Sequence, residues 1–430
     1  MPLLIAFVAF VLFRFWSASR TPTAPRVHRT TQRRPRSAPV AGPPGLRQLR
    51  ARDSGFSMPV LLDYLVLLHA RAHEAVGGGD WPALAPFLTD GARDKLVEAY
   101  RGVEGIDQIV VGGVKVLKVE QRGSYDFLYV QLEATQRERA GDGERRMDVR
   151  EQWTLRRAAG VASVAPEKVE RLGCPSCGAS VEVTSMGTCK NCGTPITAGQ
   201  LQWQATHVAV QARRPATVPE VGRAAGGEEA SVGEPTVQQP DLAARLRELH
   251  ARHPDFDDAA FGQRVDLVYH ELQAAWSEGA WERARPFVTD RMFQTLRFWV
   301  DKYARAGLRN RLEDVRLSQV VVVKVELDAW YESVTVRLWG AMRDSVVDAE
   351  GRVVGGNADV AREFSEYWTF LRAAGSGGAT HGDARTCPSC GAPLDRVNQA
   401  GICGYCDSKI TTGRFDWVLS RIDQPEAYGG

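Results

Sequence analysis

Trp281-Glu-Arg-Ala-Arg-Pro-Phe-Val-Thr-Asp290 is the stretch that decides how this chain is organised, because it occurs twice. Its counterpart is Trp81-Pro-Ala-Leu-Ala-Pro-Phe-Leu-Thr-Asp90, at an offset of 200 residues. Both segments keep Trp first, Pro-Phe in the middle and Thr-Asp at the end. Self-similarity of this kind indicates an internal repeat. We therefore expect two copies of one domain, which suits a 430-residue chain that exceeds the usual size of one hydrophobic core.

The repeat continues beyond these segments. Val114–Glu120 recurs as Val320–Glu326 at an offset of 206, and Glu151–Arg157 recurs as Glu366–Arg372 at an offset of 215. Because the offset rises by nine between these pairs, the second copy must contain a longer hairpin. We predict that hairpin around Val346–Asn357.

Each copy has the pattern of helices followed by strands. Apolar residues recur at helical spacing, and alternating runs typical of half-buried strands come after them. The helical faces comprise Val60, Leu61, Tyr64, Leu65 and Leu68 in copy one, and Phe261, Val265, Val268, Leu272 and Ala275 in copy two. The alternating runs cover about 108–120, 125–135 and 147–157, then 314–327, 330–343 and 360–373. This order predicts α+β domains with antiparallel sheets, and Asp90 and Asp290 are expected to cap helices.

Two segments have the composition of flexible linkers. Residues 18–53 are rich in Pro and Arg, residues 206–240 are rich in Pro, Gly, Ala and Glu, and neither has an apolar period. The predicted order is a membrane anchor at 1–17, the basic linker at 18–53, domain copy one at 54–165, a cysteine ribbon at 170–205, the second linker at 206–240, domain copy two at 241–375 and a second ribbon at 385–420.

The eight cysteines of the chain fall into two patterns. The first is CPSC, eleven residues and CKNC, and the second is CPSC, twelve residues and CGYC. Each CxxC pair presents two sulfurs to one ion, and two pairs complete a tetrahedral zinc site. Glycine directly follows the second cysteine at Gly178, Gly193 and Gly391, where the backbone of such a turn is left-handed. The predicted ligands of two structural zinc ions are Cys174, Cys177, Cys189 and Cys192, and Cys387, Cys390, Cys403 and Cys406.

Two other interpretations of the cysteines remain. They would form disulfides if the chain were exported, and a CxxC pair can be redox-active. Redox motifs do not normally occur as doubled pairs, however, and no thioredoxin-like βαβ pattern surrounds these. Four thiolates leave no open coordination position, so the zinc ions are not expected to be catalytic.

The N-terminus is uncharged and apolar as far as Phe13, and the apolar run resumes after Arg14 to end at Trp16. Sixteen helical residues reach about 24 Å, less than the ~30 Å hydrocarbon core of a bilayer. Arg14 can snorkel and Trp16 can lie at the interface, which makes a membrane anchor workable. The alternatives are a cleaved signal peptide ending near Ser17-Ala-Ser19, a segment that lies on the membrane surface, or a misassigned start codon.

Positive charge is concentrated directly after this apolar run. Residues 14–53 hold ten arginines against Asp53 alone, a local charge of +9 that leaves −7 for the rest of a chain whose net charge is +2. The positive-inside rule then places everything after Arg14 in the cytoplasm. A mildly acidic folded portion also argues against broad binding to a phosphate backbone.

These motifs carry a family resemblance. The WxxAxPFVTD segment follows a helix ending in Leu272–Trp276 and precedes a closing strand at Phe364–Arg372, and together they resemble the Tim forty-four-like domain. That domain is found in an inner-membrane subunit of the mitochondrial import translocase, in bacterial membrane proteins and in a mitochondrial ribosome subunit. Copy two, about 258–373, carries the resemblance, and copy one, about 57–158, matches it less well.

The resemblance implies a cone-shaped α+β domain with a curved antiparallel sheet, like that of nuclear transport factor two, and an apolar cavity without chemistry. It also implies a location against the inner membrane and a role in holding partners there. This chain departs from the family in having two copies, two ribbons and no long chaperone-binding region, so a role in an import motor does not carry over. We expect a non-enzymatic scaffold at the cytoplasmic face of the inner membrane, with an unidentified protein, the membrane or anionic lipid as partners.

Two alternative functions compete with the scaffold. Glu151 and Glu366 stand two residues before a Trp in both copies, and a carboxylate beside Trp in an apolar cavity can act as a base. The simpler interpretation is a Glu and an Arg near the strand ends that pair with neighbours or solvent. No histidine repeats at the offset of 200, and the predicted positions of five histidines are at the surface or core edge: His69, His73, His250, His253 and His270.

The second alternative is contact with the ribosome or another nucleic acid. Zinc ribbons often contact RNA, which keeps this possibility open. Neither ribbon is strongly basic, however: the first holds Lys190 against Glu182, and the second holds Arg396 and Lys409 against Asp395 and Asp407. A nucleic-acid partner is therefore expected only in the form of the ribosome.

Overall fold

The structure is a computed structural model that describes residues 36–37, 43–141, 143–166, 188–196, 202–216, 227–376, 386–397, 402–425 and 428. The chain divides into two compact units. The first unit covers residues 41–217, and the second consists mainly of residues 218–327 and 331–430. Each unit contains one of the two predicted copies.

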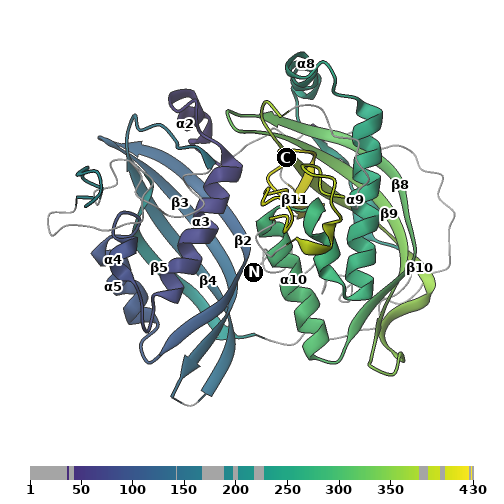
Figure 1. Cartoon of the computed structure of the whole chain (residues 1–430), viewed down its shortest axis with the longest axis horizontal. Coiled ribbons are helices and arrows are strands. Elements are labelled where there is room, and N and C mark those ends of the chain that lie inside the picture. Colours follow the sequence, from purple (N-terminus) through teal and green to yellow (C-terminus); the bar gives the residue numbers. More distant parts are fainter. Residues whose placement is uncertain are drawn as a thin grey trace. The chain divides into compact units, whose positions relative to one another are not determined.

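The first unit has four helices before a four-stranded sheet. The helices are α2 (Leu46–Arg52), α3 (Met58–Glu74), α4 (Trp81–Leu84) and α5 (Asp90–Ala99). The strands are β2 (Gly105–Arg122), β3 (Tyr125–Ala140), β4 (Gly143–Ala158) and β5 (Gln204–Pro215). The sheet is antiparallel in the order β2-β3-β4-β5, and the long helix α3 lies across it (Figure 1).

The second unit repeats this arrangement. Its helical elements are α7 (Ala230–Gly233), α8 (Leu242–Arg252), α9 (Asp258–Glu278), the 3-10 helix η1 (Trp281–Phe287), α10 (Asp290–Arg305) and the short η2 (Leu394–Arg396). Its long strands are β8 (Arg309–Leu327), β9 (Tyr331–Val347), β10 (Val353–Ala373) and β11 (Val418–Asp423), in the order β11-β10-β9-β8. Three two-residue strands complete it: β6 (Gly227–Glu228) pairs with β10, and β7 (Val237–Gln238) pairs with β1 (Arg36–Ser37).

The local sequence explains the elements that position the core. Helix α3 begins at Ser57, whose side chain accepts a hydrogen bond from the Val60 amide, and α9 ends at Gly279 in the left-handed conformation. The predicted apolar faces of both helices are buried. In β4 every second residue from Met147 to Arg157 is buried, so the alternation places Glu151, Trp153 and Arg157 on one inward face.

The longer hairpin of the second copy is confirmed. β3 and β4 are separated only by residues 141–142, whereas β9 and β10 are separated by residues 348–352 and extend further. Pairing between β9 and β10 is irregular near Val353 and between Asn357 and Arg362. The extra residues therefore lengthen the hairpin without changing the sheet order.

Both predicted linkers contain regular structure, which corrects those two assignments. Within 18–53, α2 buries Leu46 and Leu49, one turn apart, against the first unit. Within 206–240, β5 continues as far as Pro215 and pairs with β4 along most of its length, and Val208 is buried. The segments lack a long apolar period because each element has only one short buried face.

The order of ribbon and sheet also differs from the prediction. We expected each ribbon to follow a finished domain, but β5 and β11 lie beyond the ribbons in the sequence and complete the two sheets. The first ribbon is thus inserted between β4 and β5, and the second between β10 and β11. An edge strand leaves backbone groups unpaired, and β5 and β11 satisfy those of β4 and β10.

Asp90 and Asp290 are not the helix caps that we expected. Thr89 and Thr289 occupy the cap positions, and their hydroxyl oxygens accept hydrogen bonds from the amides of Ala92 and Met292. The carboxylate of Asp290 instead joins three groups. It pairs with the buried guanidinium of Arg285, accepts a hydrogen bond from Thr411 at 2.8 Å, and lies 3.0 Å from Lys409 Nζ.

This difference between the copies gives a testable prediction about stability. Asp290→Ala should leave the Arg285 guanidinium without this carboxylate and remove two contacts to the second ribbon, at a cost of about 1–3 kcal/mol. The matched change Asp90→Ala removes a side chain that is 86% exposed and should alter stability by less than about 0.5 kcal/mol.

Hydrogen–deuterium exchange measured on the full chain checks this prediction. Asp290→Ala should accelerate exchange of the amides in residues 402–415, and Asp90→Ala should leave them unchanged. Equal exchange in both variants would contradict the assignment of Asp290 as the link between η1 and the ribbon.

Candidate metal centre

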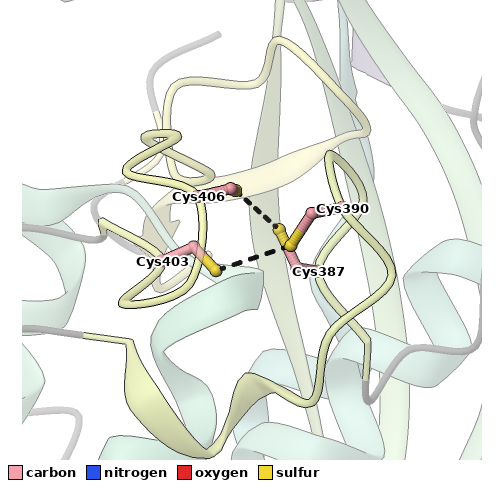
Figure 2. A group of neighbouring side chains, drawn as sticks. All are labelled: Cys387, Cys390, Cys403 and Cys406. Atoms are coloured by element: carbon pink, nitrogen blue, oxygen red, sulfur yellow. Dashed lines mark hydrogen bonds between the residues drawn. The ribbon is translucent and has the colours of Figure 1, made fainter.

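Four cysteines of the second ribbon converge on one point. Cys387 and Cys390 come from one tight turn, Cys403 and Cys406 come from another, and Figure 2 shows their sulfurs facing each other. The Cys387 and Cys406 sulfurs are 3.8 Å apart, and those of Cys390 and Cys403 are 4.0 Å apart. All four ligand atoms lie within 4.8 Å of one another.

The two turns have the same backbone conformation. The amide of Gly391 donates to the Cys387 carbonyl at 2.8 Å, and the amide of Asp407 donates to the Cys403 carbonyl at 2.9 Å. Both donors have positive φ, 74° at Gly391 and 57° at Asp407. The left-handed residue predicted after the second cysteine is therefore present in both turns, and in the second it is an Asp. This repeated turn directs two sulfurs of each CxxC pair to the same side.

The dimensions and electrostatics of this cluster fit a divalent metal. Tetrahedral coordination with metal–sulfur bonds of about 2.3 Å places neighbouring sulfurs about 3.8 Å apart, close to the observed separations. Hydrogen bonds from the Ser408 side chain and backbone lower the pKa of the Cys406 thiol to about 6. A backbone hydrogen bond from Ala392 favours ionisation of Cys390, but desolvation and the neighbouring sulfurs raise the pKa of its thiol to about 12. A bound cation would displace these protons.

A small apolar cluster supports the four sulfurs. Cys387, Cys403 and Ile410 are buried together, and Leu394 and Phe415 pack against them. So few apolar side chains cannot stabilise a fold on their own. Four sulfurs at the spacing of metal ligands therefore take the place in this ribbon that a hydrophobic core has in a larger domain.

The described part of the first ribbon has the same turn. The amide of Gly193 donates to the Cys189 carbonyl at 2.8 Å, and Gly193 has a φ of 70°. Cys189 is buried and Cys192 is exposed. The equivalent residues of the second ribbon show the same difference, because Cys387 is buried and Cys390 is exposed. The other two predicted ligands, Cys174 and Cys177, lie outside the described residues.

Glu151 and Glu366 lie in the interior and not at solvent-facing strand ends. Each is at most 1% exposed, and each accepts a hydrogen bond from the indole of the Trp two residues later, at 2.8 Å from Trp153 and 2.9 Å from Trp368. Glu366 also accepts a hydrogen bond from Gln424 at 3.1 Å. The two arginines that share their faces form buried ion pairs, Arg157 with Asp53 and Arg372 with Glu332.

Two histidines were misplaced by the sequence interpretation. His69 and His73 were expected at the surface or core edge, but both are fully buried beside Glu151. Their spacing of four residues puts them on one helical face, which is the only local signal of their proximity. The Glu lies far away in the sequence, so no short motif contains all three.

The predicted anchor at 1–17 lies outside the described residues. Among the residues that the structure does describe, no helix combines the length and the hydropathy needed to cross a membrane. A small pocket of about 20 Å³ lies near the start of α3, lined in part by Phe56, Tyr64 and Trp203. That volume accommodates about one water molecule, so this pocket does not correspond to the ligand cavity implied by the family resemblance.

The described residues define a class: two α+β units with corresponding antiparallel sheets, the second with a four-cysteine cluster between β10 and β11. Comparison with protein families places a Tim44-like domain at residues 242–381, which include α8, α9, η1, α10 and β8–β10. The resemblance noted for the second copy is thus supported. No curated protein matches the chain.

The left-handed turns provide a second testable prediction. A Cβ at Gly391 would have no heavy atom within 4 Å, so Gly391→Ala changes the backbone preference without a clash. Because a left-handed conformation costs an L-residue about 1–2 kcal/mol, this change should weaken binding of added zinc by roughly fivefold or more. Asp407→Gly removes the same cost in the second turn and should strengthen binding.

Competition titration of the full chain with a chromogenic zinc chelator measures both effects. The two variants form a matched pair in equivalent turns and should move the affinity in opposite directions. A shift in the same direction for both would mean that the turn conformation does not control metal binding.

Proposed function

We propose that this chain is a non-enzymatic scaffold that is tethered to the cytoplasmic face of a membrane and holds protein partners there. The observation that carries the proposal is the Tim44-like domain at residues 242–381. The family resemblance implies that a domain of this kind binds partners at a membrane and does not catalyse a reaction. In this proposal the first copy is a second, diverged domain of the same cone-shaped type.

The ribbons are proposed to be structural elements that each hold one zinc ion. Thiolate ligands in two CxxC pairs favour zinc, and the sulfur separations in the second ribbon suit it. The equivalent turn at Cys189 supports the same assignment for the first ribbon. Two zinc ions would give each inserted ribbon the folding energy that its few apolar residues cannot supply.

The proposed partner-binding surface is the extended β9–β10 hairpin. Val353, Val354 and Val360 are 47%, 43% and 49% exposed, and they are among the most exposed large apolar residues of the described chain. The corresponding hairpin of the first unit is charged, with Arg139, Glu144 and Arg145 near its tip. Exposed apolar side chains grouped on one hairpin favour a contact with another protein.

The case against catalysis rests on how the repeated carboxylates are held. Glu151 and Glu366 are buried, and each is fixed by an indole hydrogen bond. A general base must reach a proton on a substrate. Side chains in these positions are suited to holding the strand and helix together.

Contact with ribosomal RNA is a second candidate with one observation in its favour. On the second ribbon the Arg396 guanidinium lies over the Tyr405 ring at 5.3 Å from its centroid, and Tyr405 is 47% exposed. An exposed aromatic ring beside Arg can stack on an unpaired base. The near-neutral charge of the ribbon makes this the weaker candidate, and salt-sensitive retention on ribosomes would support it.

Partner capture tests the scaffold proposal. Full-length tagged protein isolated from detergent-solubilised membranes should retain specific membrane proteins, and Val353→Asp with Val354→Asp should abolish their retention because charge disfavours an apolar contact. Val97→Asp is the matched control, since Val97 is 48% exposed on α5 of the other unit. Equal retention by the double variant and the control would contradict the assignment of the hairpin.

Membrane attachment is tested separately with anionic vesicles. Deletion of residues 1–16 should leave a protein that binds at low salt through the +9 segment, at about 1 kcal/mol per basic residue near the surface. Binding should be lost above a few hundred millimolar salt, because the screening length is roughly 10 Å at 0.1 M and shortens further.

A charge variant identifies the responsible segment. In the truncated protein, replacing the arginines at 26, 29, 33, 34 and 36 with Gln should abolish the remaining vesicle binding. Binding that persists despite both salt and these substitutions would show that the folded domains, and not the basic segment, contact the lipid.

A further inference from the structure

Three ionisable side chains meet in the interior of the first unit. His69 and His73 lie one turn apart on α3, and Glu151 projects from β4 toward them. All three side chains are 0% exposed. The imidazole rings stack with their centroids 4.0 Å apart. This cluster is separate from the cysteine ribbons and plays no part in the proposed scaffold function.

Both imidazoles direct a ring nitrogen to the same carboxylate. His73 Nε2 is 3.0 Å from Glu151 Oε1, and His69 Nε2 is 3.3 Å from Glu151 Oε2. The ligand atoms of the three residues lie within 4.8 Å of one another. Bonds of about 2.0–2.2 Å from nitrogen and oxygen to a tetrahedral zinc place neighbouring ligands a little over 3 Å apart. The observed spacing therefore needs little adjustment to hold an ion.

The hydrogen bond of His73 fixes which nitrogen faces the carboxylate. Its Nδ1 lies 2.8 Å from the His69 carbonyl oxygen, which requires a proton on Nδ1. In the neutral ring Nε2 then carries a lone pair, which faces a carboxylate oxygen at 3.0 Å. Two lone pairs repel at that distance, so a cation has to lie between them, either a proton or a metal ion. A second ring nitrogen bonded to a backbone carbonyl is the usual arrangement of a metal-bound histidine.

His69 distinguishes between these two cations. Its Nδ1 has no hydrogen-bond partner among the described residues although the ring is fully buried, and its Nε2, at 3.3 Å from Glu151 Oε2, makes no well-formed hydrogen bond there. One proton shared by His73 and Glu151 satisfies those two groups but leaves His69 unsatisfied. A metal ion would bind His69 Nε2 together with the other two groups, and an unpaired buried polar atom is otherwise costly.

The carboxylate is oriented independently of the histidines. Tyr100 donates to Glu151 Oε1 at 2.8 Å, and the Trp153 indole donates to Oε2 at 2.8 Å. A further carboxylate, Glu138, acts on the charge of His73, and its own partner is Arg213. Glu151 is thus held in place by neutral donors, with its negative charge available to a cation.

The second unit shows that the fold does not require the histidines. Glu366 and Trp368 repeat the Glu151–Trp153 pair. The ring centroids of Tyr269 and Trp368 are 5.6 Å apart, and those of His69 and Trp153 are 5.7 Å apart, so Tyr269 occupies the place of His69. At the same offset of 200, Gln273 replaces His73. The carboxylate–indole pair therefore belongs to both copies, and the two imidazoles are specific to the first.

We propose that His69, His73 and Glu151 form a buried binding site for one divalent transition-metal ion, with zinc as the expected occupant. Two histidines at positions i and i+4 of a helix with a carboxylate from another element are a frequent ligand set for zinc. Full burial makes this ion structural: it joins α3 to β4 in the first unit.

The experiment measures metal in the full chain with both ribbons intact. The variant His69→Tyr with His73→Gln gives the first unit the side chains that the second unit already accommodates. After saturation with zinc and removal of excess metal, elemental analysis should find one ion per chain fewer in this variant than in the wild-type protein. Glu151→Gln, which keeps the shape of the side chain, should lose the same ion.

Cobalt substitution separates this site from the ribbons. Cobalt bound by thiolates has a strong charge-transfer absorption in the near ultraviolet, whereas a site of two imidazoles and a carboxylate has only weak visible bands. Because cobalt bound by four thiolates also absorbs in the visible, the histidine variant should lose only part of the visible absorption and keep the full charge-transfer intensity. Cys387→Ser with Cys390→Ser is the reciprocal control and should lose charge-transfer intensity while it keeps the site on α3.

Two results would overturn the proposal. Equal metal content in the wild type, the histidine variant and Glu151→Gln would mean that the cluster holds only a proton. Cobalt spectra in which all absorption follows the cysteines would mean the same. Circular dichroism of each variant verifies that it is folded, and Glu151→Gln carries the test if the double substitution is not.

Discussion

Each sheet depends on a strand that the chain reaches only after passing through a ribbon. The outer backbone groups of β4 are paired by β5. Those of β10 are paired by β11. Bringing such distant segments together costs conformational entropy, and the compact ribbon between β10 and β11 reduces the freedom of that connection. The second ribbon is also fixed to its domain through Asp290, Lys409 and Thr411. We therefore expect formation of the second ribbon and completion of its sheet to be coupled.

The two units show how one fold accommodates different interior chemistry. The inward face of the third long strand keeps a Glu, a Trp and an Arg in both copies, and both arginines form buried ion pairs. Against that constant face, α3 presents imidazoles and α9 presents Tyr269 and Gln273. Since the same backbone tolerates both sets, the divergence is more informative about function than the shared residues are.

The surfaces diverge in the same way. The β3–β4 hairpin of the first unit is short and charged, whereas the β9–β10 hairpin of the second is longer and exposes valines. The family match also falls on the second unit. In the proposed scaffold, partner contact is accordingly assigned to the second unit.

The sequence by itself determined the internal repeat, the buried faces of α3 and α9, the longer second hairpin and the left-handed turns of the described CxxC pairs. These features depend on short-range periodicity and spacing, which a one-dimensional pattern records directly. Only the tertiary structure decided that β5 and β11 complete the sheets, that Thr89 and Thr289 cap their helices in place of the neighbouring Asp residues, and that His73 meets Glu151 across 78 positions. The sheet pairings and the His–Glu contact arise when packing brings distant segments together, and no local pattern contains that information. The cap was missed for a different reason: in a Thr-Asp pair either side chain can cap the helix, and only the backbone geometry selects one.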